Sequence, residues 1–536
     1  MTGILPFAGL ALEVLNSLRI GIERISRQSM LFGVAILVVA FLDVWWISGD
    51  LFHHGIDEGI YLEGGRRVAS SESPYVDFFA LTGPLTFWIE GTLARLGGVN
   101  VTLMRLPVAL DLAFLVWAVY WLALQFERAF FSAGLALMFL VYETKVTQLV
   151  VNHRWDSAAL GTAAVLFAVS ADRTGGRKMW MLSGCLAAAA AWATPTVLLV
   201  AVPLLLWSGR RGIGGVLSFL GGGAVVTLLA AGYLESRHAL GPMIESMRWT
   251  SVNYAGANSV PYGFLGFAPS MPSNDRGLAE RVATLAWSGW NALPAVLPPV
   301  AILGWAWRLW RRKDSGEQPR LILLLAATVA MVLSAWPRWS SMQLLFVDGL
   351  PFTLCGILFH RSLSARWRPG LYAGLILLTA GLGVQKAAAP LNYWSFSTRA
   401  GTMRGVMDDA GFLDPFERQI HTGDTLFVFP YHPVLYPLLN ARNPTRYSFL
   451  QPGMMTAEDE RKALTELAAS QPHWVILGDF SREVVLSIWP GSDPARIPME
   501  AMHDYLLTHY RETARVRETW GPLILMERIE TPLPLP

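Results

Sequence analysis

Long apolar runs recur along this chain and constrain its fold more than any other feature. A helix of about 20 apolar residues crosses roughly 30 Å of hydrocarbon, and only 15% of the 536 residues are charged, against about a quarter in soluble domains. We therefore expect a polytopic α-helical membrane protein with about eleven transmembrane helices. The runs occupy residues 30–48, 103–125, 129–147, 157–171, 179–193, 196–208, 213–234, 283–308, 321–336, 343–360 and 370–388.

Charge, cysteine content and motifs argue against several functions. A formal net charge of +2 and the lack of an arginine-rich or RNA-binding aromatic motif argue against nucleic acid as a partner. Cys185 and Cys355 both lie inside apolar runs, so we expect no disulfide and no cysteine metal site. Phosphate-binding loops, HExxH zinc sites and GxSxG elbows do not occur in the sequence, which disfavours an ATP-driven pump or a common hydrolase.

The basic loops predict which side of the membrane each connection faces. Residues 79–98 form a twelfth candidate run that Glu90 and Arg95 interrupt, and counting it reverses the side of everything after it. Short loops rich in Lys and Arg prefer the cytoplasm. If 79–98 is a helix at the outer membrane surface, five basic loops fall inside together: 126–128, 172–178, 208–212, 310–320 and 360–369.

This topology divides the chain into three parts. Residues 1–29, with Arg19, Arg24 and Arg27, are expected to be a cytoplasmic N-terminal segment and not a cleaved signal peptide. Residues 30–389 form the transmembrane domain, with outer-face loops 49–102 and 235–281. Residues 390–536 are expected to form a periplasmic α/β domain, because 424–430, 473–479 and 520–529 resemble strands and 457–470 an amphipathic helix.

The first outer loop contains the first candidate functional residues. Asp57 and Glu58 stand side by side just after a membrane run, and Asp77 follows in the same loop. Solvated loop carboxylates are the simplest explanation. If they converge with a carboxylate from another outer turn, one of them can act as a general base on a hydroxyl group.

A second outer turn, "VNHRWDS" at 151–157, combines His153, Arg154 and Asp156. One interpretation is a helix start, with Asp156 or Ser157 as the N-cap and Arg154 snorkelling. In the other, Asp156 is a second active-site acid and the two basic residues lie near a phosphate. The two interpretations are compatible.

Charged residues near other membrane runs also need a partner or a function. Arg338, between Trp336 and Trp339, is either an arginine of the interfacial aromatic belt or a phosphate ligand. Asp111 lies in a membrane run, where a carboxylate is costly, and Arg105 is its expected partner.

Three sequence stretches together resemble a known superfamily. "DEGIYLEGGRRVASSESPYVDFFALTGPL" at 57–85, "NHRWDSAAL" at 152–160 and the C-terminal "DTLFVFPYHPVLYPLLNARNPTRYSFLQPG" are similar to the GT-C membrane glycosyltransferases of the bacterial protein-mannosyltransferase and aminoarabinose-transferase type. Those proteins often carry Lys-Pro-Pro-Leu or His-Pro-Pro-Leu after the acidic residue. Here Thr82-Gly83-Pro84-Leu85 stands instead, so an arginine would have to replace the lysine.

The resemblance implies sugar transfer from a polyprenyl-phosphate donor to an exported acceptor, with inversion at the anomeric carbon. The partners would be that donor, a cell-envelope acceptor (lipid, glycan or protein) and membrane lipid, in a bacterial inner membrane. No cofactor follows with certainty from the resemblance, and a divalent metal is possible. The residue roles that it implies are Asp57 or Glu58 as the base, Asp156 and Asp77 holding the acceptor or a cation, and Arg66, Arg67, His153, Arg154 and Arg338 near the phosphate.

Two other functions stay open at this point. A transporter or flippase of lipid-linked substrates would place functional charges within its helices. A catalytically inactive scaffold would use its exterior domain to bind a partner.

Overall fold

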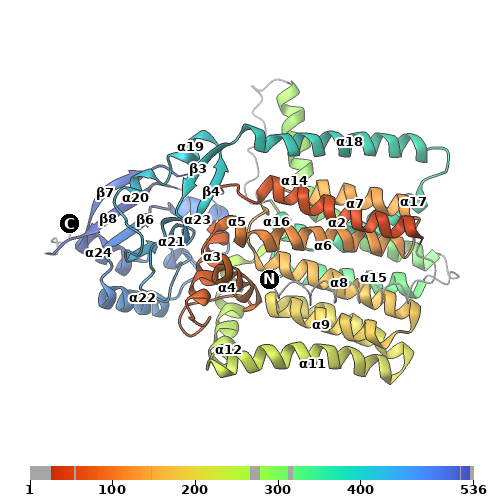
Figure 1. Cartoon of the computed structure of the whole chain (residues 1–536), viewed down its shortest axis with the longest axis horizontal. Helices are drawn as coiled ribbons and strands as arrows, with labels where there is room; N and C mark the ends of the chain where they lie inside the picture. The colour runs from red at the N-terminus through yellow and green to blue at the C-terminus, as the bar shows by residue number, and fades with distance from the viewer. Residues whose placement is uncertain are drawn as a thin grey trace.

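A helical bundle and a smaller α/β region lie end to end in the computed structural model of the chain (Figure 1). The structure describes residues 26–52, 56–145, 148–265, 278–311, 318–518 and 521–530. Most of the expected N-terminal segment, residues 1–25, lies outside the described residues.

Each expected membrane run falls on helix in the bundle. Five stretches are long and apolar enough to cross a membrane by themselves: Arg27–Ser48, Val101–Leu124, Ile213–Ser236, Trp287–Arg311 and Arg368–Asn392. Many large apolar side chains of α2, α11, α14 and α18 are exposed, as lipid-facing helices require. The helices are α2 (Arg27–Ser48), α6 (Leu106–Leu124), α7 (Ala129–Glu143), α8 (His153–Thr174), α9 (Arg177–Ala193), α10 (Leu198–Ser208), α11 (Ile213–Ser236), α14 (Leu278–Arg311), α15 (Gln318–Leu333), α16 (Ser341–Leu345), α17 (Gly349–Ser362) and α18 (Arg368–Ala388).

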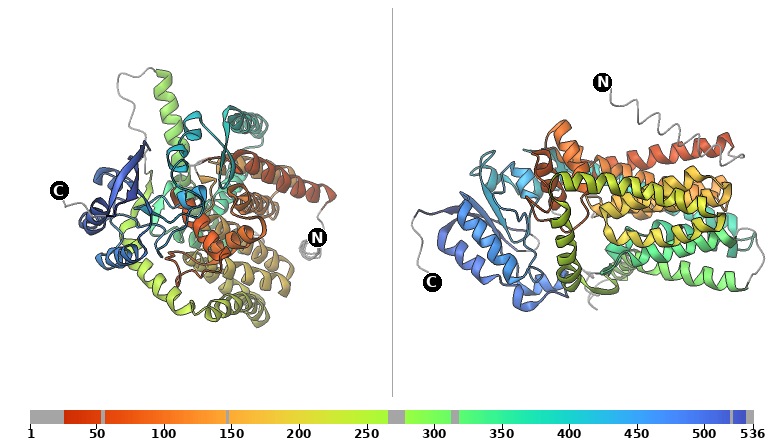
Figure 2. Two further views of the ribbon diagram at one scale, coloured as in Figure 1. Left: turned by 60° about the vertical axis from the view of Figure 1, so that its left-hand side comes forward. Right: turned by 90° about the horizontal axis from the view of Figure 1, so that it is seen from below.

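Three helices of the first outer loop lie between the bundle and the α/β region (Figures 1 and 2). They are α3 (Ile56–Ala69), α4 (Leu85–Gly97) and α5 (Val101–Met104). The helix expected over 79–98 begins only at Leu85, because the preceding turn packs against the bundle. A Cβ on Gly83 would lie 1.9 Å from the carbonyl oxygen of Trp192 at the end of α9, so a side chain there would push the turn away.

The second long loop also folds against the α/β region. It contains α12 (Leu240–Trp249), a π-helical turn (Thr250–Tyr254), α13 (Ala255–Asn258) and β1 (Val260–Phe264). β1 pairs in parallel with β2 (Arg338–Ser340). Arg338, which precedes α16, is thereby fixed in the same layer as the loop.

The α/β region has a four-stranded sheet in the order β5-β6-β8-β7. β5 (Leu426–Phe429) and β6 (Trp474–Gly478) pair in parallel, whereas β8 (Leu523–Arg528) is antiparallel to β6 and to β7 (Tyr510–Val516). Three of these strands and the main helix lie where the sequence predicts them. The helices are α19 (Met407–Ala410), α20 (Asp414–Glu417), α21 (Leu435–Leu439), α22 (Ala457–Ser470), α23 (Arg482–Ile488) and α24 (Glu500–His509).

No sequence pattern predicted the edge strand β7 or the hairpin of β3 (Trp394–Thr398) and β4 (Gly401–Gly405). β7 reads "YRETARV", and most of its side chains are exposed or half-buried. Charged residues of this kind are typical of edge strands, but they leave little apolar alternation to detect.

Close packing of backbone joins the α/β region to the bundle. A Cβ on Gly59 of α3 would lie 2.0 Å from the amide nitrogen of Val434, so the two segments touch without an intervening side chain. Leu435 and Tyr436 belong to the same buried apolar cluster as the membrane helices. At the hairpin, Arg404 forms an ion pair with Asp50 at 2.6 Å. The two parts are therefore packed as one body.

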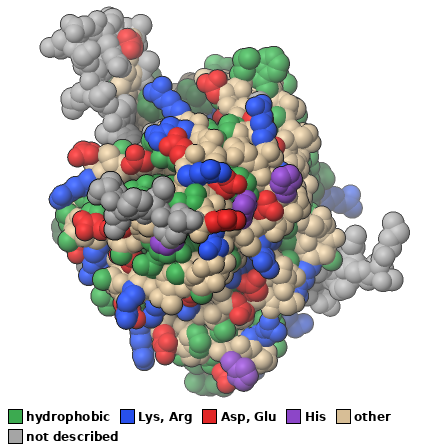
Figure 3. Space-filling view, turned by 90° about the vertical axis from the view of Figure 1, so that its left-hand side faces the viewer, with side chains coloured by type: hydrophobic (Ala, Val, Ile, Leu, Met, Phe, Trp, Pro, Cys, Tyr) green, Lys and Arg blue, Asp and Glu red, His purple; other side chains and the backbone are tan. Residues whose placement is uncertain are grey.

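The end of the molecule formed by the α/β region has a water-compatible surface. Figure 3 shows acidic and basic side chains interspersed over this face. Exposed charges of mixed sign suit an aqueous environment, in contrast to the apolar exterior of the bundle helices.

The contact at Gly59 predicts a selective loss of stability. We expect Gly59→Ala to lower the melting temperature of the purified protein, since the added methyl group forces α3 and Val434 apart, at a typical cost of about 1–3 kcal/mol. Gly134→Ala in α7 is the matched control, because a Cβ there meets nothing within 4 Å. Equal melting temperatures for the two variants would contradict the packing described.

Candidate active site

Asp57 lies in the first turn of α3, where the bundle meets the α/β region. Its Oδ1 accepts a 3.0 Å hydrogen bond from the hydroxyl of Tyr431. The side chain is exposed, and yet burial raises the pKa of its carboxyl. Protein groups thus surround this carboxyl although solvent reaches it, and we call this position the recess.

Several polar groups face this carboxyl. The hydrogen bond from Tyr431 and the guanidinium groups of Arg338 and Arg154 oppose the effect of burial and lower the pKa of Asp57. The phenol groups of Tyr61 and Tyr254 complete the surroundings. Asp57, from the first outer loop, thus meets residues from three other parts of the sequence.

Glu58, its neighbour, points away into a buried ion pair. Both of its oxygens accept 2.7 Å hydrogen bonds from Arg105, and the two side chains are each 1% exposed. Its Oε1 also accepts from the amide of Val151 at 3.1 Å. Glu58 is therefore positioned to hold α3 in place, whereas Asp57 faces the recess.

The "NHRWDS" turn starts a helix, but not at the expected residue. The N-cap is Asn152, whose side chain accepts from the amide of Arg154 at 3.0 Å, so Asp156 lies in the first turn instead of capping it. Asp156 accepts a hydrogen bond from the Thr86 hydroxyl of α4.

The expected pairing of Asp111 with Arg105 is wrong. All three side-chain nitrogens of Arg105 donate elsewhere, to the carboxylate of Glu58 and to the carbonyl oxygens of Ser48 and Leu51.

The side chain of His153 is hydrogen-bonded to Thr194, in the short segment that separates α9 from α10. Its Nδ1 lies 2.7 Å from the hydroxyl oxygen of Thr194, and its ring centroid lies 5.7 Å from that of Tyr61. Thr194 in turn donates to Ser157 at 2.9 Å. The segment at Thr194 and Pro195 thus holds the first turn of α8 through hydrogen bonds to His153 and Ser157.

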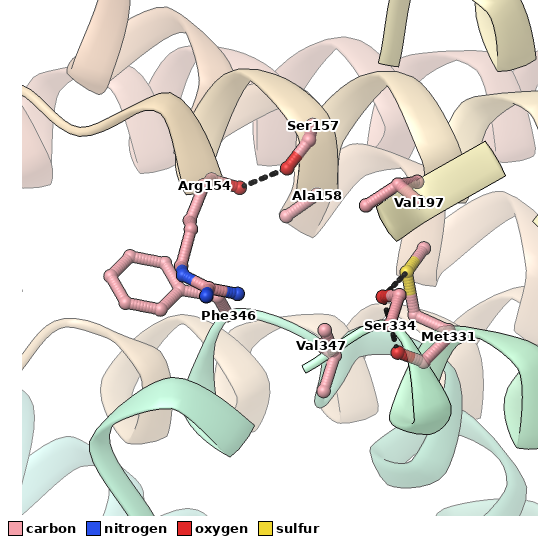
Figure 4. Close-up of a pocket in the computed structure, with 8 residues that line it drawn as sticks. All are labelled: Arg154, Ser157, Ala158, Val197, Met331, Ser334, Phe346 and Val347. Atoms are coloured by element: carbon pink, nitrogen blue, oxygen red, sulfur yellow. Dashed lines mark hydrogen bonds between the residues drawn. The ribbon is translucent and has the colours of Figure 1, made fainter. Parts of the chain in front are cut away.

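Arg154 is a buried cation that forms no ion pair with a described residue. Its side chain is 7% exposed, and within the described ranges its guanidinium makes no hydrogen bond or ion pair. Figure 4 shows the guanidinium beside the ring of Phe346, in a small cavity that Val197, Met331 and Val347 also line. The cavity of about 10 Å³ has room for roughly one water molecule. A buried guanidinium in this state favours binding of an anion.

Arg338 of β2 is hydrogen-bonded to two other segments, the end of α13 and the end of α23. Its Nη2 donates to the carbonyl of Ile488 at 2.7 Å and its Nη1 to Asn258 at 3.4 Å. Neither partner is charged, and the Arg338 guanidinium is one of the groups that lower the pKa of Asp57.

Asp77, Arg66 and Arg67 are placed differently. Asp77 is exposed, and its carboxylate accepts from the amide of Ser73 at 2.6 Å. Arg66 forms a two-point ion pair with Glu63 at 2.7 Å. Arg67 is hydrogen-bonded to Glu72 and to two carbonyl groups. These contacts satisfy each side chain within or beside its own loop and do not bring it to Asp57.

The residues that sequence reasoning missed come from outside the acidic loop. Arg105 was assigned to another partner, and Tyr431 lies in "FPYHPVL", where nothing in the pattern links it to the first loop. Across the part of the chain that the structure describes, no group of three or more His, Cys, Asp or Glu side chains could hold a metal ion. We derive no step through a metal.

Comparison with solved structures identifies the fold. ArnT from Cupriavidus metallidurans, bound to undecaprenyl phosphate, aligns with 93% of this chain and 98% of its own, at a TM-score of 0.54 and 14% identity. Its apo state covers 92% and 98%, at 0.53 and 13%. Archaeoglobus fulgidus AglB, an oligosaccharyltransferase in complex with an inhibitory peptide and a dolichol-phosphate, covers 95% and 76%, at 0.49 and 11%.

No protein-family model and no curated protein matches the sequence. The likeness to ArnT nevertheless extends over nearly the whole of both chains. The chain therefore shares its fold with ArnT, a GT-C glycosyltransferase of the type that its sequence motifs resemble.

Because Glu58 and Arg105 form a buried ion pair, we expect neutralising Glu58 to lower the stability of the protein strongly. Glu58→Gln leaves the guanidinium of Arg105 buried without its counter-charge, which costs about 3–5 kcal/mol, so the melting temperature should fall steeply. Glu512→Gln, in an exposed pair with Arg515, should leave it unchanged. A Glu58→Gln protein as stable as the Glu512→Gln protein would show that the ion pair does not anchor α3.

Proposed function

We propose that this chain is an inverting glycosyltransferase that moves a sugar from a polyprenyl-phosphate donor to an exported acceptor. The observation that carries the proposal is the placement of Asp57, a recessed carboxylate, in the electrostatic field of Arg154 and Arg338. A carboxylate base near two guanidinium groups suits a reaction in which a hydroxyl loses a proton and a phosphate leaves.

In the proposed reaction the acceptor hydroxyl attacks the anomeric carbon of the donor sugar. The hydroxyl proton passes to Asp57, the bond between that carbon and the phosphate oxygen breaks, and the phosphate departs with both bonding electrons. Arg154 and Arg338 stabilise its charge. These arginines take the place of the lysine that "TGPL" lacks.

The other candidates have supporting roles in this proposal. Glu58 fixes the direction of Asp57 through Arg105, so Asp57 and not Glu58 takes the proton. Asp156 and His153 shape the start of α8, which carries Arg154. Asp77, Arg66 and Arg67 stabilise the loop around α3. Any divalent metal would have to be held by Asp57 with groups of the substrate.

The donor class is supported by one likeness. ArnT, whose fold this chain shares, was crystallised with undecaprenyl phosphate. An unpaired buried arginine is well suited to bind the phosphate of such a lipid, since guanidinium groups form two-point hydrogen bonds to phosphate.

We place the site at the periplasmic face of a bacterial inner membrane, with about eleven crossings and a cytoplasmic N-terminus. The basic connections α10–α11 and α17–α18 turn at the end of the bundle farthest from the α/β region (Figure 1). By the preference of Lys and Arg for the cytoplasm, the α/β region and Asp57 then face the periplasm, where cell-envelope acceptors are found.

Loss of the base should abolish transfer. With radiolabelled polyprenyl-phosphate sugars and envelope acceptors, we expect Asp57→Asn to lower kcat by about 10²–10⁴-fold. Asp504→Asn on the exposed surface of α24 makes the same chemical change away from the site and should keep wild-type activity. Transfer at the wild-type rate by Asp57→Asn would contradict its assignment. Export of a lipid-linked substrate by a wild-type protein that transfers no sugar would instead favour a transporter.

Removing the buried cation should weaken donor binding. We expect Arg154→Met to reduce the affinity for undecaprenyl phosphate roughly 10–100-fold, the usual worth of a hydrogen bond to a charged group. Arg173→Met, in the last turn of the same helix, controls for the loss of an arginine from α8. Binding can be measured by native mass spectrometry, and equal affinities for the two variants would contradict the phosphate site.

A further inference from the structure

We propose that Tyr431 of the α/β region is a positioning residue for the catalytic base, orienting Asp57 and keeping it ionised. This inference rests on the proposed function and assigns part of the active site to the C-terminal region. Its basis is the 3.0 Å hydrogen bond from the Tyr431 hydroxyl to Oδ1 of Asp57.

The ring of Tyr431 is held firmly by its own region. It is 4% exposed, and it contacts the rings of Phe449 and Trp489 edge-on at centroid distances of 5.3 and 5.4 Å. The tyrosine follows β5 directly, three residues before Val434, which touches Gly59 on α3. The hydroxyl is therefore fixed relative to Asp57 by packing on both sides.

The hydrogen bond gives the two oxygens of Asp57 different roles. Oδ1 is occupied by Tyr431, and Oδ2 has no hydrogen bond among the described residues. An acceptor hydroxyl can therefore reach Oδ2 without displacing a protein group. A tyrosine hydroxyl that donates to a carboxylate favours its ionised form, which is the form that a general base needs.

The hydrogen bond from Tyr431 also opposes the effect of burial on the pKa of Asp57. Burial raises the pKa of Asp57, and Tyr431 is the strongest of the groups that lower it, ahead of Arg338 and Arg154. The other titratable groups that face it are Tyr61 of α3 and Tyr254 of the π-helical turn. Without the Tyr431 hydroxyl, more of the protein would carry a protonated, inactive Asp57 at a given pH.

The experiment is a pH profile of kcat/KM for sugar transfer by Tyr431→Phe, which removes only the hydroxyl. A higher pKa for Asp57 means that activity is lost at a higher pH as the solution is acidified. We therefore expect the acidic limb of the profile to move to higher pH in Tyr431→Phe. On that limb kcat should be lowered roughly tenfold, and it should recover at higher pH. The KM for the donor should be unchanged.

Tyr447→Phe is the matched control. Tyr447 is 3% exposed in the same region, and its hydroxyl makes no hydrogen bond among the described residues, so its removal should leave the limb in place. Melting temperatures of Asp57→Ala, Tyr431→Phe and the double variant form a cycle that reports the contact without activity, because alanine removes the acceptor. We expect the effects of the two changes on stability to be non-additive.

The outcomes separate the two claims. Wild-type transfer with an unmoved acidic limb in Tyr431→Phe would overturn the role of Tyr431 and leave the proposed function standing. Additive melting-temperature changes would show that the hydroxyl and the carboxylate do not interact, which also overturns it. A wild type without any transfer would overturn the proposed function, and the role of Tyr431 with it.

Discussion

The buried ion pair between Arg105 and Glu58 is the interaction on which the rest of the site depends. Arg105 precedes α6, and its side chain binds the carboxylate of Glu58, from α3, and two carbonyl groups at the end of α2. Glu58 also accepts from Val151, just before α8. One guanidinium thus fixes the relative positions of the segments that carry Asp57 and Arg154. Because adjacent helical residues point about 100° apart, anchoring Glu58 inward turns Asp57 toward the recess.

The site is assembled from all parts of the chain. The first outer loop supplies Asp57, the start of α8 supplies Arg154, the β1–β2 layer supplies Arg338, and the α/β region supplies Tyr431. The bundle alone would leave Asp57 without its hydrogen-bond donor. In this account the C-terminal region is part of the catalytic centre and not only an attached domain.

Sequence reasoning located the helices well, because apolar runs in a membrane protein must be helical to satisfy their backbone groups. It also identified Arg154 and Arg338, two charges that act on Asp57, because both lie in turns that the topology placed on the same face as Asp57. It could not separate Asp57 from Glu58, since only the position of Arg105 decides which of two neighbours turns inward. Tyr431 was out of reach for a related reason: its contact joins residues 374 positions apart, and a single sequence carries no signal for such a pair.

A structure determined with undecaprenyl phosphate bound would test the central claim most directly. The account predicts that the phosphate lies within hydrogen-bond distance of Arg154, on the side that faces Asp57, with Arg338 close to it. A phosphate bound elsewhere, for example beside Lys145 and Lys386 near the C-terminal ends of α7 and α18, with Arg154 still unpaired, would contradict the account.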